Sequence, residues 1–281
     1  MNIKAEHLMY VYEAGTGYEK RALDDVTCEI KGGEFIGLIG HTGSGKSTFI
    51  QHLNGLLKAH SGDIKVDDVS IYSPGYNMIE LRSNVGLVFQ YPEHQLFESD
   101  VLKDVCFGPR NLGASKEEAE VLAKEALASV NLGSERFYKA SPFDLSGGQK
   151  RRAAIAGVLA MKPKVLILDE PTAGLDPKGR EEILGLISQI HKDLKITVIL
   201  VSHSMEDVAN YVDRLLVMDK GVLAFDGTPK EVFRHYKELE KLGLAAPQVT
   251  YCMNDLKAAG MDVDTDAITI SEAVESIMKN F

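Results

Sequence analysis

Residues 34–49, EFIGLIGHTGSGKSTF, pass from a short apolar run through a glycine-rich turn to a lysine and then a serine and a threonine. The turn matches the pattern G-x-x-x-x-G-K-[ST], in which glycines let backbone N–H groups approach phosphate oxygens. The apolar run predicts a buried strand, and the residues after the lysine predict a helix whose N-terminus adds partial positive charge. We expect Lys46 to reach the β- and γ-phosphates of a nucleotide and the Ser47 hydroxyl to bind Mg²⁺. The candidate nucleotide ligands in this loop are Gly40, Thr42, Gly43, Ser44, Gly45, Lys46, Ser47 and Thr48.

Three further apolar runs predict strands of the same sheet. KVLILDE at 164–170 and ITVILVSH at 196–203 are almost continuously apolar, and NVGLVFQ at 84–90 is similar. The amphipathic segment 180–194 predicts a helix between the first two of these strands, which gives a βαβ unit. The chain is therefore expected to form an α/β fold with a parallel sheet covered on both faces.

Polar side chains stand where these strands end. Because a parallel sheet presents ligands at the carboxyl ends of its strands, these groups are expected to share one edge with the phosphate-binding loop. Asp169 ends the most apolar strand, where a carboxylate is costly to bury unless a cation such as Mg²⁺ compensates it. Glu170 should point toward the γ-phosphate, where a general base for the attacking water would lie. Taken alone, His203 and Gln90 are also typical of edge residues that only form hydrogen bonds.

Composition places the chain among ordinary globular proteins. It has 281 residues and a net charge of −10, which argues against gripping nucleic acid or lipid headgroups as its main task. The three cysteines show no paired spacing and indicate reduced thiols. The N-terminus lacks the layout of a signal peptide, and the apolar runs are far shorter than the roughly 20 residues of a membrane span. If the protein works at a membrane, partner proteins must hold it there.

The remaining patterns are simpler. They predict short strands near the N-terminus, one alternating strand in the middle, an amphipathic helix with a serine N-cap, and C-terminal helices without visible chemistry. These segments are 2–38, 63–71, 115–130 with Ser115 as the N-cap, 229–243 and 270–280.

A second glycine-rich turn, DLSGGQKRR at 144–152, has no lysine in the phosphate-binding place. Ser146 is a candidate N-cap for the helix that follows, and the two glycines expose backbone amides at its start, which makes an anion site. The alternative is a well-capped helix without a ligand. Two anion sites can enclose one γ-phosphate only if they face each other. If the fold keeps them apart in one chain, a second chain must supply the second half of the site.

Over about residues 2–229 the chain closely resembles the nucleotide-binding subunit of ABC (ATP-binding cassette) transporters. The resemblance is carried, in this order and spacing, by GHTGSGKS, Gln90, LSGGQ, LILDE, AGLD and His203. The resemblance implies a P-loop NTPase domain at 1–229, with a RecA-like parallel sheet core, an antiparallel β subdomain and an α-helical subdomain at about 91–160. It also implies a Mg-dependent ATPase that binds ATP and works as a head-to-tail dimer. In that dimer the signature segment, LSGGQ at 145–149, would contact through Ser146 and Gly148 the γ-phosphate held by Lys46 of the other subunit.

The same resemblance gives roles to single residues. Gln90 would couple Mg²⁺ and water to the membrane partner, Asp176 would communicate between the two ATP sites, and His203 would contact the γ-phosphate. Tyr12 matches the aromatic residue that stacks on adenine, although Tyr10 and Tyr18 lie close to it in the sequence and a strand-surface tyrosine is an alternative. The implied sets are Glu170, His203 and Gln90 for catalysis, Ser47, Gln90 and Asp169 for the metal, and Leu145, Ser146, Gly147, Gly148 and Gln149 for the signature.

A narrower resemblance comes from EAGTGYEKRALDDV, IGHTGSGKST, QHLNGLLK and FQYPEHQLFE, which are similar to the energy-coupling factor (ECF) ATPases of prokaryotes, in particular their second, A-prime type. It implies a motor subunit of an importer for vitamins or metal ions, held at the cytoplasmic face of the membrane by a transmembrane coupling protein and a substrate-binding membrane protein. Residues 91–98 would be the docking surface, in which Leu96 and Phe97 are either partner contacts or packing residues. Residues 230–281 resemble a helical extension for dimer contact, and a packed cap is the alternative.

Three other functions are alternatives to that of an importer motor. A conventional ABC transporter ATPase would share every motif of the catalytic site. A non-transport ABC ATPase that acts on DNA needs a long coiled-coil insertion, and residues 90–144 are too short for one; ribosome-associated relatives generally carry two cassettes, and this chain has one. A small-molecule kinase would also use a phosphate-binding loop but would give no role to the signature segment.

Overall fold

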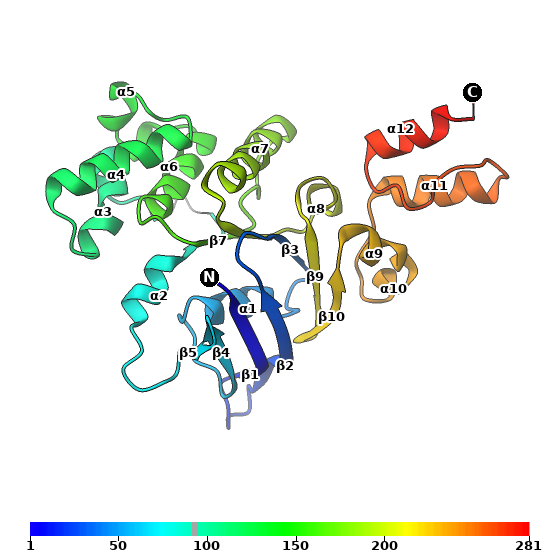
Figure 1. Cartoon of the computed structure of the whole chain (residues 1–281), viewed down its shortest axis with the longest axis horizontal. Coiled ribbons are helices and arrows are strands. Elements are labelled where there is room, and N and C mark those ends of the chain that lie inside the picture. Colours follow the sequence, from blue (N-terminus) through cyan, green and yellow to red (C-terminus); the bar gives the residue numbers. More distant parts are fainter. Residues whose placement is uncertain (92–94, 281) are drawn as a thin grey trace.

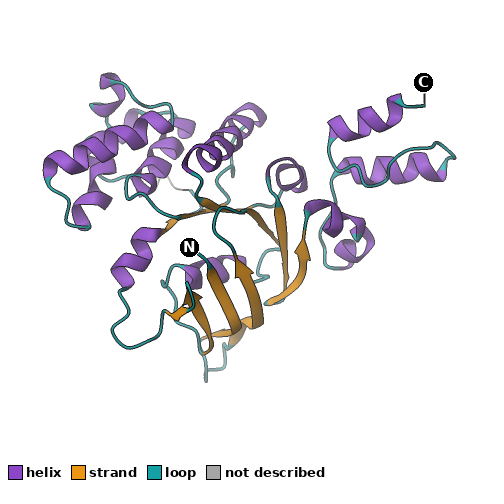
Figure 2. Ribbon diagram, viewed as in Figure 1, coloured by secondary structure: helices purple, strands orange, loops and turns teal. Residues whose placement is uncertain are grey.

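A computed structural model describes residues 1–91 and 95–280 of the chain. Strands gather in two sheets, and helices cover them (Figures 1 and 2). The strands are β1 (Ile3–Tyr12), β2 (Lys20–Ile30), β3 (Phe35–Ile39), β4 (Ser61–Val66), β5 (Val69–Ser70), β6 (Val85–Val88), β7 (Val165–Asp169), β8 (Thr197–Val201), β9 (Arg214–Asp219) and β10 (Val222–Gly227). The helices are α1 (Lys46–Leu53), α2 (Met78–Asn84), α3 (Val101–Asn111), α4 (Lys116–Ser129), α5 (Glu135–Tyr138), the 3₁₀ helix η2 (Pro142–Asp144), α6 (Gly147–Leu159), α7 (Pro177–Leu194), α8 (Met205–Tyr211), α9 (Pro229–Arg234), α10 (Tyr236–Lys241), α11 (Gln248–Ala258) and α12 (Ile270–Met278).

The larger sheet has the strand order β10-β9-β3-β8-β7-β6. The pairs from β9 to β6 are parallel, and β10 joins β9 in antiparallel fashion. Every residue of β3, β7 and β8 is buried, which explains their continuous apolar sequences. The expected α/β fold with a covered parallel sheet is therefore confirmed.

The two faces of this sheet contribute to separate hydrophobic cores. Because successive strand residues point to opposite faces, Leu166 and Leu168 join one core while Val165 and Ile167 join the other. The first core contains residues of α6, α7 and α8. The second contains α1 and the inner face of the smaller sheet, whose order is β2-β1-β4-β5 and whose pairs are antiparallel. The phosphate-binding loop thus lies on the side of the antiparallel sheet.

The helices α3, α4, α5 and α6 lie together at one end of the molecule (Figure 1). Ser115 caps α4 as expected, because its Oγ accepts a hydrogen bond from the Glu118 N–H and the Glu118 carboxylate accepts one from the Ser115 N–H. Among the residues that the structure describes, no helix combines the length and apolar character needed to cross a membrane.

The expected single strand at 63–71 is wrong. The chain turns at Asp67 and Asp68, whose φ angles are 46° and 66°, and β4 pairs with the short strand β5 as a hairpin. Positive φ at both central residues is the requirement of a type I′ turn, and aspartate tolerates it better than most residues do. The alternating pattern continued through the turn and hid it.

The C-terminal helices lie at the opposite end of the molecule from α3–α6 (Figure 1). The single helix expected at 229–243 is interrupted at His235, which separates α9 from α10. Farther along, Met253, Val263, Ala267 and Ala273 form a small core of their own. Two ion pairs join this region to α9, since the Arg234 guanidinium contacts the Asp266 carboxylate and Lys230 Nζ lies 2.6 Å from Glu272 Oε1.

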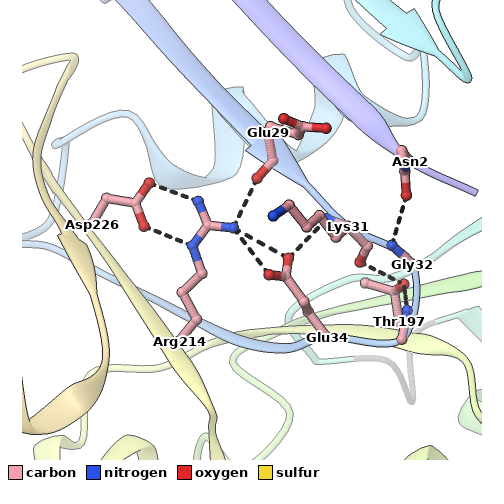
Figure 3. Close-up of polar contacts among 9 residues, drawn as sticks. Asn2, Glu29, Lys31, Gly32, Glu34, Thr197, Arg214 and Asp226 are labelled. Atoms are coloured by element: carbon pink, nitrogen blue, oxygen red, sulfur yellow. Dashed lines mark hydrogen bonds and ion pairs between the residues drawn. The ribbon is translucent and has the colours of Figure 1, made fainter.

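Arg214 ties the two sheets together (Figure 3). Its Nε and one terminal nitrogen each lie 2.7 Å from an oxygen of Asp226 on β10. Its other terminal nitrogen donates to the Glu29 carbonyl of β2 at 2.8 Å and to the Glu34 carboxylate at 3.2 Å. A bidentate guanidinium with satisfied donors is the favourable geometry for a partly buried ion pair, and the hydrogen bonds to Asp226 raise the pKa of Arg214 above its usual value.

Replacing Arg214 by alanine should lower the free energy of unfolding by about 3 kcal/mol, because Asp226 and Glu34 would lose their cation. The matched control is Arg21→Ala, which removes an ion pair with Asp24 at 3.1 Å on the surface. The control should cost less than about 1 kcal/mol. Urea unfolding of both variants would measure the difference in the free energy of unfolding. Equal losses would show that the contacts of Arg214 stabilise the fold no more than a surface ion pair does.

Candidate nucleotide-binding site

The phosphate-binding loop has a conformation that needs its glycines. Gly45 precedes α1 with a φ of 107°, and a Cβ added there would lie 2.5 Å from the Ala22 carbonyl oxygen. A Cβ on Gly40 would lie 2.4 Å from the Met218 carbonyl oxygen. Gly43 also has a positive φ, of 82°. The loop is therefore shaped by contacts with β2 and β9 as well as by its own sequence.

Lys46 begins α1 with its side chain curled back into the loop. Its Nζ donates to the Gly40 carbonyl at 2.7 Å and to the His41 carbonyl at 3.1 Å, and only 6% of the residue is exposed. Burial lowers the pKa of Lys46, while the nearby Glu170 and Asp169 carboxylates act in the opposite direction. A buried cation held only by carbonyl oxygens is suited to a negatively charged ligand.

Asp169 and Ser47 lie side by side, at the end of β7 and in the first turn of α1. The Ser47 hydroxyl donates to Asp169 Oδ2 at 3.1 Å. Asp169 is 7% exposed, and its burial raises the pKa of the carboxyl, against the effects of Ser47 and Lys46. A hydroxyl and a buried carboxylate form an oxygen-only donor set, which fits Mg²⁺ with the rest of its shell supplied by phosphates and water.

Glu170 lies at the centre of a polar chain along the sheet edge. Gln90 Nε2 donates to Glu170 Oε2 at 2.7 Å, and His203 Nε2 lies 2.6 Å from Glu170 Oε1. The backbone of Glu170 has a φ of 49°, an uncommon value for this residue type and one often found where function constrains the chain. The structure thus brings together the three side chains that the sequence placed at three separate strand ends.

The three candidate tyrosines have different surroundings. The Tyr12 hydroxyl lies 3.1 Å from Thr48 Oγ1, which puts its ring, 39% exposed, beside the phosphate-binding loop. Tyr10 packs against the rings of Tyr12 and His52, with centroids 4.9 and 4.8 Å apart. Tyr18 is 85% exposed. Tyr12 is therefore the tyrosine whose ring is both accessible and held next to the loop.

The signature segment begins α6 with a capping box. Ser146 Oγ accepts from the Gln149 N–H at 3.4 Å, and Gln149 Oε1 accepts from the Ser146 N–H at 3.0 Å. Leu145 is buried, whereas a Cβ added to Gly147 or Gly148 would meet no atom of the described chain within 4 Å. Since α6 and α1 pack into cores on opposite faces of the sheet, the segment and the phosphate-binding loop do not enclose one ligand within this chain.

Asp176 begins α7, where its side chain accepts from the Gly179 N–H at 2.9 Å. The turn before it is joined to α6, because Arg151 donates to the Ala173 carbonyl at 2.9 Å. A depression of about 450 Å³ beside this turn is lined in part by Glu170, Gly174 and His203. The sequence did not indicate a role for Arg151, because it lies in the basic run KRR at 150–152, and only the structure shows that it is buried.

Asp219 was missed as well. It ends β9 beside the loop, and its carboxylate lies 2.9 Å from His41 Nε2. The run RLLVMD at 214–219 has the same form as VLILD at 165–169, an apolar strand that ends in aspartate. That repeated pattern was the signal that identifies a further strand end at this edge.

The expected docking segment is described only in part, because Pro92, Glu93 and His94 lie outside the described residues. Leu96 is buried in the core of the α3–α6 region, so it is a packing residue. Phe97 is 57% exposed, and its ring meets that of Phe107 edge-on at a centroid distance of 4.9 Å.

Comparisons with known proteins agree with this geometry. Residues 23–173 match the model of the ABC transporter family. The chain is 58% identical over 281 residues to the energy-coupling factor transporter ATP-binding protein EcfA2 of Clostridium tetani, covering 100% of this chain and 98% of that protein. It is 56% identical over 279 residues to the protein of the same name from Clostridium perfringens, covering 99% and 98%.

Solved structures show the same architecture. One is cbiO1 from Clostridium perfringens, described as part of the ABC transporter complex cbiONQ, with a TM-score of 0.75, 42% identity and coverage of 90% of this chain and 98% of that one. Another is the ATP-binding cassette MJ0796, a dimer in a post-hydrolysis state with ADP and Pi, with a TM-score of 0.71, 29% identity and coverage of 81% and 98%.

Proposed function

This chain belongs to the ABC transporter family and, within it, to the energy-coupling factor ATP-binding proteins of the A-prime type, and from that premise we propose that it hydrolyses Mg-ATP at Glu170 as one half of a dimer that drives a membrane importer. The observation that carries the proposal is the single sheet edge at which Lys46, Asp169 and Glu170 meet. Hydrolysis of ATP coupled to transport is the activity of this family, and the residue roles that follow are proposals.

Each group at the edge has a chemical task. Lys46 would bind the β- and γ-phosphates, which replace the carbonyl oxygens that now hold it. Ser47, Asp169 and Gln90 would hold Mg²⁺, and a bound Mg²⁺ supplies charge stabilisation to the phosphate oxygens. Tyr12 would stack on adenine beside Thr48.

Glu170 would accept the proton of the attacking water as the general base. Its two oxygens are held by Gln90 and His203, so the carboxylate reaches its position through its neighbours on β6 and β8. On closure, His203 would turn its imidazole to the γ-phosphate and stabilise charge there. Glu170 would then be released toward the water.

The openness of Gly147 and Gly148 supports a shared site. Neither glycine has a positive φ, and added Cβ atoms would meet no atom of the described chain within 4 Å, so nothing described in the chain requires glycine there. Glycine would be required at these two positions if a group from another molecule approached the backbone closely. The group that fits the exposed helix N-terminus is the γ-phosphate bound to a second subunit, with Ser146 as a hydrogen-bond donor. Asp176 would lie near the dimer axis and couple the two ATP sites to each other.

The C-terminal helices would add a second contact between subunits. Ile270, Val274 and Met278 recur at a spacing of four residues on α12 and are exposed by 74%, 54% and 64%. Such a stripe on one helical face is typical of a surface that packs against another protein. This assigns residues 230–281 a role in assembly rather than in chemistry.

The membrane partner would dock on the α3–α5 region. A groove of about 900 Å³ is lined there by residues that include Phe107, Cys106 and Tyr138, next to the exposed ring of Phe97. An apolar groove with a polar rim suits an amphipathic helix of a transmembrane coupling protein. The chain would thus be held at the cytoplasmic face of the membrane, and the cargo would bind a separate membrane protein.

Glu170→Gln should retain ATP binding, lower turnover by at least about 100-fold and accumulate a closed, ATP-bound dimer, because glutamine keeps the shape but accepts no proton. Steady-state hydrolysis, nucleotide binding and size-exclusion chromatography with ATP would measure these effects. The control is Glu182→Gln, which changes the exposed partner of Arg152. Hydrolysis at the rate of the unchanged protein would reject Glu170 as the base.

Ser146→Arg should disable the ATP site of the other subunit and leave its own site intact, because the signature segment faces the neighbouring nucleotide in a head-to-tail dimer. Mixed dimers would be made with one Ser146→Arg subunit and one Lys46→Ala subunit. Such a dimer should keep one working site, because both changes fall on the same shared site, whereas a dimer with both changes on one subunit should keep none. Loss of the site in the same chain instead would contradict the shared-site proposal.

The transport role is tested by what the chain binds in native membranes. A tagged chain extracted in mild detergent should copurify with a second ATPase that carries the signature segment and with polytopic membrane proteins, identified by mass spectrometry. The smallest membrane protein recovered would indicate the cargo. Recovery without any membrane protein, or with ribosomes or DNA-processing proteins, would leave the ATPase chemistry in place and overturn the transport role.

A further inference from the structure

The turn between β9 and β10 forms a wall of the phosphate-binding loop. The Gly221 N–H donates to the Ser44 carbonyl at 2.9 Å, and the Asp24 N–H donates to the Gly221 carbonyl at 2.8 Å. The Met218 carbonyl is the atom that a Cβ on Gly40 would strike. The loop, the turn after β9 and strand β2 are therefore connected by hydrogen bonds.

One side-chain pair in this wall has an unusual proton requirement. His41 Nδ1 lies 2.8 Å from the Thr42 carbonyl oxygen, and His41 Nε2 lies 2.9 Å from Asp219 Oδ1. A carbonyl oxygen and an ionised carboxylate only accept hydrogen bonds, whereas a neutral imidazole has a single N–H to donate. Both bonds form together when the ring carries its second proton. The pair is then a charge-assisted hydrogen bond that spans 178 residues of sequence.

We propose that His41 and Asp219 are positioning residues for ATP binding, and that they form a charged tether that fixes the first turn of the phosphate-binding loop. The tether acts on the ligand through the backbone of the loop, because the His41 ring also contacts the Thr42 carbonyl within that loop. A loop that is already fixed loses less conformational entropy when the nucleotide arrives. The tether keeps both hydrogen bonds when the ring carries two protons and loses one of them when it carries one.

The charges around His41 favour coupling to the nucleotide. The Asp219 carboxylate approaches the His41 ring from β9, and Lys46 Nζ of α1 donates to the His41 backbone carbonyl. Lys20, at the start of β2, lies near the same loop, with its Nζ 3.9 Å from a Cβ placed on Gly43. Both lysines repel an imidazolium, and a bound triphosphate would offset that repulsion. Binding of the nucleotide and protonation of His41 therefore favour each other, as linkage requires.

The test uses Asp219→Asn in the full chain. The asparagine amide can donate to His41 Nε2 while Nδ1–H donates to the Thr42 carbonyl, so both bonds remain with a neutral ring. Equilibrium binding of a fluorescent ATP analogue would be measured at about pH 6 and about pH 8, the range over which histidine side chains titrate. The variant should bind about fivefold more weakly than the unchanged chain at the lower pH and within about twofold of it at the higher pH.

Two further variants complete the experiment. Asp25→Asn alters an exposed pair of the same chemistry, in which Asp25 Oδ1 lies 2.7 Å from His7 Nδ1, and should show a ratio near one at both pH values. His41→Leu removes both hydrogen bonds and should raise KM for ATP, more at low pH, with kcat changed by less than about twofold. Because each ratio compares two proteins at one pH, the ionisation of ATP itself cancels.

A ratio for Asp219→Asn that is the same at both pH values, or no larger than that of Asp25→Asn, would overturn the proposal. So would a fall in kcat without a change in KM for His41→Leu, since that is the signature of a group acting in the transition state. Thermal melts check the fold. An unfolded Asp219→Asn protein at the higher pH would also overturn it, because a neutral tether is expected to satisfy both side chains there.

Discussion

Burial of the parallel sheet on both faces is the constraint on which the rest of the molecule depends. Strands β3, β7 and β8 have no exposed residue, so polar groups can stand only where the strands end. Asp169, Glu170 and His203 therefore collect at one edge, beside the loop that follows β3. The grouping of the proposed catalytic residues is a consequence of excluding polar side chains from the interior of the sheet, and Gln90 joins it after the end of β6.

Lys46 and Asp169 bring opposite charges into a buried part of the sheet edge. Burial lowers the pKa of Lys46 and raises that of Asp169, which means that each side chain would gain from a ligand of the opposite charge. A triphosphate with its metal supplies both signs at once. This electrostatic arrangement fits the proposed binding of ATP together with Mg²⁺.

The sequence predicted the features that follow from local patterns and missed those that depend on distant pairing. The loop at Lys46 and the strand ends at Asp169 and Glu170 could be placed because parallel strands share an edge. The hairpin at Asp67 was missed because alternation continues through a two-residue turn. The contacts of Arg214 could not be predicted, since its partners Glu29 and Glu34 lie 185 and 180 residues away and only folding brings them together.

Met253, Val263, Ala267 and Ala273 of the C-terminal region form a small core of their own, whereas Ile268 joins the first core of the sheet. Chains are synthesised from the N-terminus, and regions with their own core tend to fold as units. The residues of the phosphate-binding loop and of both sheets are therefore synthesised before the stripe on α12. Folding of the nucleotide-binding domain can therefore begin before the ribosome has made the surface that we propose for pairing with another subunit.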